Sequence, residues 1–175
     1  MVLTENMAIN VIYHRIRSSV LAAAPRYTPP TWWECDVYAV SKALFTTEYE
    51  VKLSRADFLA DAKKRRRKYE RVGGVWSDRH EQKHQSVQDG EGTNRFYYVV
   101  PLGLLSLDDI PSWAGLIELT NRCGRNGWVY WHPGVVKRAP SLHRTKVTLD
   151  VVQQMHMVLA HRFWWMRMFK KGAVT

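Results

Sequence analysis

Apolar residues recur at three- and four-residue intervals near both ends of the chain, which is the spacing of one face of a helix. Thr4 is a suitable N-cap, and the apolar positions after it predict a first helix over 4–24, ended by the proline at position 25. Near the other end, the same spacing predicts a helix over about 148–169. The stripe of that helix consists of Val152, Met155, Leu159, Phe163 and Met166.

Between these two helices, short alternating or continuously apolar segments predict strands at 32–40, 44–54, 95–101, 115–120 and 127–133. Only three residues separate the first two strands, so we expect them to be antiparallel neighbours. A helix is predicted over 55–72 and a short helix or turn over 106–114. The segment 73–93 is rich in Gly, Gln, Asp, Ser and His, which predicts a long mobile insertion.

The alternation of helices and strands predicts a single α/β domain over residues 1–175, with a mixed β-sheet flanked by helices. A chain of 175 residues is long enough for one sizeable core. No apolar run approaches the ~18–20 residues of a membrane span, and no secretory signal precedes the first helix. Cys35 and Cys123 lie far apart, which is typical of a reducing compartment. We therefore expect a cytoplasmic protein.

Positive charge changes the picture most, because the formal net charge is +10. The segment 61–72 holds seven Lys or Arg residues against Asp61 and Glu70. A solvated helix face is the alternative reading, but consecutive cations repel one another on a helix, so a polyanionic partner is favoured. DNA is the expected partner, with no membrane. The residues expected to bind its backbone are Lys63, Lys64, Arg65, Arg66, Arg67 and Lys68.

Candidate chemistry lies on the first two predicted strands. Glu50 and Lys52 alternate along the second strand and therefore share a face, and Asp36 in the first strand can meet Glu50 across the pair. Two carboxylates, together with the backbone carbonyl of Val51, form a hard-oxygen site suited to Mg²⁺, with Mn²⁺ as a substitute. A cation there would activate water toward a phosphate, and Lys52 would position that water.

Two glutamates and two histidines are further candidates, and each has a plainer alternative role. Glu48 shares the face of Glu50 and is a further candidate ligand, although a solvated strand end is the plainer reading. Glu5 is a candidate carboxylate from the first helix, with helix capping as its alternative. His80 and His84 have no Cys or carboxylate partners at zinc spacing. No glycine-rich nucleotide motif is present, so no nucleotide cofactor is expected.

The Asp36 and Glu50-Val51-Lys52 pattern resembles the PD-(D/E)XK nuclease superfamily. That resemblance implies a restriction-endonuclease-like core of α-β-β-β-α-β type. A longer likeness, in "YEVKLSRADFLADAKK" and "RFYYVVPLGLLSLDDIPSWAGLIEL", is similar to the MmcB-like DNA-repair proteins and related phage proteins. It covers roughly residues 34–133, and the insertion at 73–93 departs from it. Asp57 and Asp61 belong to the shared pattern, yet we expect them to stabilise the start of their helix.

Together these observations predict a Mg²⁺-dependent deoxyribonuclease acting in DNA repair, recombination or phage DNA processing. The resemblance implies a bacterial or phage-encoded protein, and a homodimer by analogy with enzymes that cut both strands. Two alternatives remain open. One is a catalytically inactive nuclease-fold module that binds DNA. The other is a phage assembly protein that uses the aromatic C-terminal helix as an interface.

Overall fold

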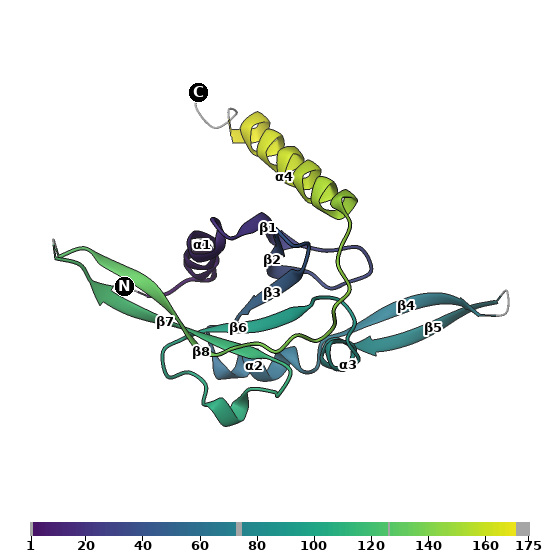
Figure 1. The fold of residues 1–175 in the computed structure, drawn as a ribbon, viewed down its shortest axis with the longest axis horizontal. Helices are drawn as coiled ribbons and strands as arrows, with labels where there is room; N and C mark the ends of the chain where they lie inside the picture. Colours follow the sequence, from purple (N-terminus) through teal and green to yellow (C-terminus); the bar gives the residue numbers. More distant parts are fainter. Residues whose placement is uncertain (1, 73–74, 126, 171–175) are drawn as a thin grey trace.

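The computed structural model describes residues 2–72, 75–125 and 127–170 (Figure 1). In chain order its elements are α1 (Glu5–Ile16), β1 (Val20–Tyr27), β2 (Cys35–Ser41), β3 (Thr46–Val51), α2 (Arg55–Asp61), β4 (Arg65–Val72), β5 (Val75–Gln82), α3 (Lys83–Gln88), β6 (Arg95–Pro101), the 3₁₀ turn η1 (Leu107–Asp109), β7 (Gly115–Cys123), β8 (Val129–Lys137) and α4 (Leu149–Lys170).

Six of the strands form one mixed sheet in the order β1-β2-β3-β6-β7-β8. The pairs β1–β2, β2–β3 and β7–β8 are antiparallel, whereas β3–β6 and β6–β7 are parallel. Val37 lies opposite Tyr49, as the short connection between the first two predicted strands implied. The α/β class with a mixed sheet flanked by helices is therefore confirmed.

Apolar side chains cover both faces of this sheet. On one face, α1 packs through Ile9 and Ile12 against a cluster that includes Val51 of β3 and Val99 of β6. The other face carries a second cluster, to which α2, α3 and α4 contribute Phe58, Val87, Val152 and Met155. The strands β4 and β5 form a separate two-stranded ribbon that projects from the body (Figure 1). Among the described helices, none has the length and apolar character to cross a membrane.

The prediction of one helix over 4–24 is wrong in its second half. Helix α1 ends at Ile16, and Val20–Tyr27 is strand β1, which pairs with β2. Ala24 and Tyr27 are buried on the sheet face that α2, α3 and α4 cover. Pairing and burial thus override the helix propensity of the alanines. Pro25 is tolerated in β1 because this strand lies at the edge of the sheet.

The prediction of a helix over 55–72 is also wrong beyond Asp61. Helix α2 ends there, and the basic segment forms β4, paired in antiparallel register with β5. The register sets Arg66 opposite Glu81 and Tyr69 opposite Asp78. The basic segment therefore continues as the first strand of a ribbon and not as a helix.

The segment 73–93 was predicted as a long loop, but it contains β5 and α3. Residues 73 and 74 lie outside the described part of the chain. Val87 of α3 is fully buried, so this segment contributes to the core. The C-terminal helix predicted over about 148–169 corresponds to α4.

Candidate active site

Strand β3 carries Glu48 and Glu50, and Lys52 follows directly after its last residue. The strand lies inside the sheet, between β2 and β6. Glu48, Glu50 and Lys52 are 0, 2 and 3% exposed. In the parallel register Glu48 lies beside Phe96 and Glu50 beside Tyr98, so the charges enter the apolar face that α2 and α3 cover. The alternative of a solvated strand face is therefore excluded for these residues.

Asp36 on β2 lies beside this group. Its Oδ2 accepts a hydrogen bond from the backbone N–H of Val51 at 2.7 Å. Burial, followed by the negative charge of Glu50, raises the pKa of Asp36 to about 6. The structure thus brings Asp36 near Glu50, and the group of Val51 that contacts Asp36 is its N–H, whereas the predicted ligand is its carbonyl oxygen. The charge of Lys52 also acts on Asp36.

Glu50 is surrounded by ammonium groups. Its Oε1 lies 2.9 Å from Lys52 Nζ and 2.6 Å from Lys64 Nζ, and its Oε2 lies 3.0 Å from Lys83 Nζ. Burial alone would raise the pKa of Glu50, but the lysines, with Lys83 foremost, outweigh it and lower that pKa. Glu50 is consequently held as a carboxylate in an almost water-free position.

Asp61 is a site residue that the sequence analysis assigned to another role. It is the last residue of α2, so the expectation that it stabilises the start of that helix is wrong. Its carboxylate accepts hydrogen bonds from Lys52 Nζ at 3.0 Å and from Tyr98 Oη at 3.2 Å, and it lies 3.0 Å from His84 Nε2. Burial opposes ionisation, yet His84 and the lysines keep the pKa of Asp61 far below its usual range.

Glu48 is not a solvated strand end. Its Oε1 forms an ion pair with Lys83 Nζ at 2.7 Å, and its Oε2 accepts from Trp32 Nε1 at 2.8 Å. Burial nevertheless raises the pKa of Glu48. Its bonded partners are an ammonium and an indole within the protein, so Glu48 serves to hold Lys83.

Glu5 does not bond to the site residues in the structure. It is partly exposed on α1 and pairs with Arg26 at 2.9 Å. Its negative charge still contributes to raising the pKa of Asp36, although it is the smallest of the causes. The helix-capping alternative is not observed either, because the Thr4 side chain caps α1.

The sequence does not single out Lys83, because its segment has the composition of a loop, and it sets His84 aside because no Cys or carboxylate partner stands at zinc spacing. Lys83 opens α3 and is fully buried, and His84 follows it. His80 belongs to β5, so the two histidines do not share a helix. His84 Nε2 lies 2.8 Å from Tyr98 Oη in addition to its contact with Asp61.

Asp36 and Glu50 offer carboxylate oxygens, the type of ligand that Mg²⁺ prefers. Within the described residues, no group of three or more His, Cys, Asp or Glu side chains is arranged to hold a metal ion. Mg²⁺, however, keeps several waters and commonly takes one or two carboxylates, and Asp36 with Glu50 supply two. The ammonium of Lys64 lies 2.6 Å from Oε1 of Glu50, and the Lys64 side chain is 43% exposed. A cationic group therefore reaches this oxygen from the solvent side.

The predicted DNA-binding residues divide into three groups. Lys63 is exposed just after α2, and Arg65 is exposed at the start of β4. Lys64 is directed into the site instead, toward Glu50 and Asp61. The backbones of Arg66, Arg67 and Lys68 lie in β4, but their side chains are outside the part of the chain whose side chains are described.

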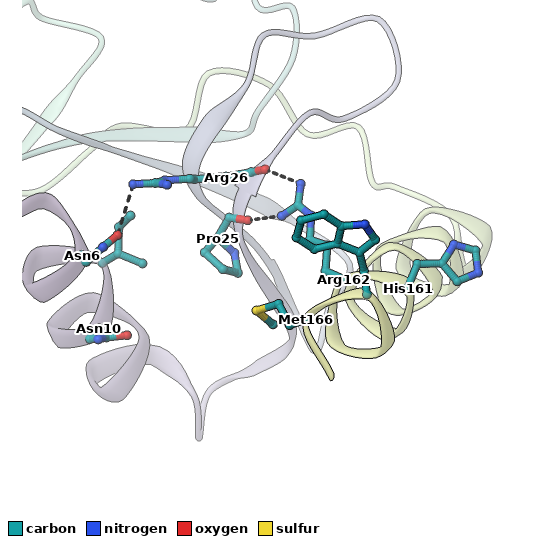
Figure 2. A pocket seen from close by; sticks show the side chains of 9 residues that line it. Asn6, Asn10, Pro25, Arg26, His161, Arg162 and Met166 are labelled. Carbon is teal, nitrogen blue, oxygen red and sulfur yellow. Dashed lines mark hydrogen bonds between the residues drawn. The ribbon is translucent and has the colours of Figure 1, made fainter. Parts of the chain in front are cut away.

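A cleft of about 780 Å³ lies elsewhere, between α1, β1 and α4 (Figure 2). Arg162 spans it and donates hydrogen bonds to the backbone oxygens of Pro25 at 2.8 Å and Arg26 at 2.7 Å. The lining shares no residue with the charged cluster on β3. The described residues that line the cleft also carry no cluster of carboxylates. The candidate active site is therefore assigned to β2 and β3.

The raised pKa of Asp36 predicts a pH-dependent contribution to stability. A carboxyl group whose pKa is about 6 in the folded protein and 3.8 in its ordinary state binds more protons when folded. The stabilisation is complete below the ordinary pKa and is lost as the pH rises through about 6. We expect the unfolding free energy of the wild type, relative to Asp36→Asn, to fall over this window by about 1 kcal/mol, a value reduced for partial solvent screening.

Urea denaturation of both proteins between about pH 4 and pH 7 measures this difference. Groups other than Asp36 titrate in both proteins, so their contributions largely cancel. A wild-type-minus-variant difference that stays constant across the window would show that Asp36 is not protonated preferentially in the folded state.

The sequence matches no family model and no curated protein. Among solved structures, the chain is similar to the SPO1766 protein of unknown function from Silicibacter pomeroyi, with a TM-score of 0.63 and 17% sequence identity. The similarity covers 99% of this chain and 98% of the other. At this level of identity it shows a shared fold over the whole length of both chains.

Proposed function

We propose that the protein is a Mg²⁺-dependent nuclease of the PD-(D/E)XK type that hydrolyses phosphodiester bonds in DNA. The observation that carries the proposal is the meeting of Asp36 and Glu50 beside the Val51 main chain, with Lys52 directly after the strand that carries Glu50. An Asp in one strand followed by Glu-x-Lys at the next is the pattern of the superfamily that the sequence resembles, with Cys35 at the position of its proline.

The fold supports this proposal. The elements α1, β1, β2, β3, α2 and β6 follow the α-β-β-β-α-β order that the resemblance implies, with the hairpin ribbon and α3 inserted before β6. In that core, β1, β2 and β3 form an antiparallel meander, and β6 joins β3 in parallel. The site lies on β2 and β3, where the resemblance would place it.

The proposed chemistry assigns a task to each residue. Asp36 and Glu50 would hold Mg²⁺, which supplies an activated water and polarises the scissile phosphate. Lys52 Nζ, fixed between Glu50 and Asp61 at 2.9 and 3.0 Å, has no freedom to swing away and would orient that water. Asp61 in turn fixes Lys52, which makes Asp61 a positioning residue.

A second candidate is a nuclease-fold module that binds DNA without cutting it. One specific observation favours it, because Glu50 is already neutralised by the ammonium groups of Lys52, Lys64 and Lys83. In this reading the charged cluster only stabilises the base of the β4–β5 ribbon, and the positive net charge provides the DNA affinity.

The two candidates differ in one assay. Supercoiled plasmid and a branched DNA substrate are incubated with the protein in EDTA, Mg²⁺ or Mn²⁺, and binding is measured in parallel by electrophoretic mobility shift. The nuclease predicts cleavage that requires the divalent cation and is lost in Asp36→Ala and Lys52→Ala. Salt-sensitive binding without cation-dependent cleavage would identify the binding module and contradict our proposal.

A further inference from the structure

Both ends of the β4–β5 ribbon place a lysine on the same carboxylate. Lys64 immediately precedes β4, and Lys83 immediately follows β5. The two residues approach Glu50 from different sides, Lys64 at Oε1 and Lys83 at Oε2. The backbone N–H of Lys83 also donates to the carbonyl oxygen of Lys64 at 3.1 Å, so the base of the ribbon closes directly over Glu50.

The two lysines differ in their access to solvent. The Lys83 side chain is 0% exposed and its ammonium bridges Glu48 and Glu50. The Lys64 side chain is 43% exposed, and its ammonium bridges Glu50 Oε1 at 2.6 Å and Asp61 Oδ1 at 2.8 Å. Lys83 is therefore held in the interior, whereas the half-exposed Lys64 side chain can rotate into water.

We propose that the ammonium of Lys64 occupies the Oε1 atom of Glu50 in the metal-free protein, on the side of Asp61, and that a divalent cation must displace it in order to bind that oxygen. This inference deepens the proposed function and rests on it. Lys52 contacts the same oxygen but is 3% exposed, so it stays in place when the cation enters. Lys64 is thus a competitor for the cation, and the neighbouring Lys52 is a fixed partner of the site.

The competition has a consequence for DNA binding. Once displaced, the Lys64 ammonium is a free cation at the base of a ribbon that carries several other cations, where a phosphate group can pair with it. Coupling between two ligands is reciprocal, so a phosphate that captures Lys64 favours cation binding at Glu50 by the same factor. The site would then take up its cation most readily when DNA is present.

The test is the affinity for Mn²⁺, measured by isothermal titration calorimetry on the full chain without DNA. We expect Lys64→Gln to bind Mn²⁺ about 2- to 5-fold more tightly than the wild type, the size expected for removal of a half-exposed ion pair. Lys64→Arg keeps the competing charge and should bind Mn²⁺ with wild-type affinity. Lys63→Gln removes an exposed charge one residue away and controls for the general electrostatic field.

The variants distinguish failure of this inference from failure of the proposed function. If Glu50→Gln abolishes Mn²⁺ binding while Lys64→Gln binds no more tightly than Lys63→Gln, Lys64 is not the competitor, and the proposed function still stands. If Glu50→Gln binds Mn²⁺ as the wild type does, the cation is not at Glu50, and both proposals fail. Circular dichroism of Lys64→Gln shows whether the variant is folded, and Lys64→Arg supplies the comparison if it is not.

Discussion

Replacement of Lys83 by methionine is expected to lower the free energy of unfolding by about 3–5 kcal/mol, the cost of breaking a buried ion pair. Lys83 has no exposed side-chain surface, and its ammonium lies 2.7 Å from Glu48 and 3.0 Å from Glu50. Methionine has a similar length and fills the same space. The loss therefore arises from two carboxylates that remain buried without their common cation.

Urea or thermal unfolding measures this effect, and Lys63→Met provides a matched control on an exposed lysine, for which we expect a change below about 0.5 kcal/mol. The double variant Glu48→Gln/Lys83→Met should recover part of the loss, because a neutral amide can still accept from Trp32 Nε1 and no longer needs a cation. A single Lys83→Met variant as stable as the control would mean that Glu48 and Glu50 do not depend on Lys83.

The central pair of strands could be predicted from the sequence because its signals are local. The alternation along β3 and the short connection between β2 and β3 were sufficient to place Asp36 near Glu50. Strand β1 could not be predicted in the same way. Its alanines favour a helix in isolation, and what makes them a strand is the pairing of Ala24 with Tyr38 in β2.

The remaining site residues could not be predicted from local pattern because their partners are distant in sequence. Lys83 reaches Glu50 across 33 positions, and His84 reaches Asp61 across 23. The polar, Gly- and Gln-containing composition around them suggests a loop, while their burial depends on α3 packing through Val87. The one signal in the sequence is the place of Asp61 in the segment that resembles the MmcB-like proteins.

The sequence shows the positive charge of the basic segment but does not predict its secondary structure. Its concentration of Lys and Arg was apparent, but a helix over 55–72 would have kept Lys64 on a solvated surface. The helix ends at Asp61 instead, and the chain turns so that Lys64 contacts Glu50 before β4 begins. A negative site within reach of the turn therefore decides the position of Lys64, and that site is a product of the tertiary fold.

Asp36→Asn is expected to reduce Mg²⁺-dependent DNA cleavage by at least about 100-fold, because changes even in the outer partners of metal ligands cost 10- to 100-fold. The same variant should be at least as stable as the wild type near neutral pH. Burial and the charge of Glu50 raise the pKa of Asp36 to about 6, so its ionised form is disfavoured in the folded protein. The amide oxygen of asparagine can still accept from the N–H of Val51.

Asp36→Asn is thus expected to lower activity without lowering stability, whereas Lys83→Met is expected to lower stability. A plasmid cleavage assay at matched protein concentration measures the first effect, and urea unfolding measures the second. Asp108→Asn is the control, since Asp108 is an exposed aspartate in η1. If Asp36→Asn cleaves DNA as fast as Asp108→Asn, Asp36 is not a ligand of the catalytic cation, and the carboxylate pair on β2 and β3 has only a structural role.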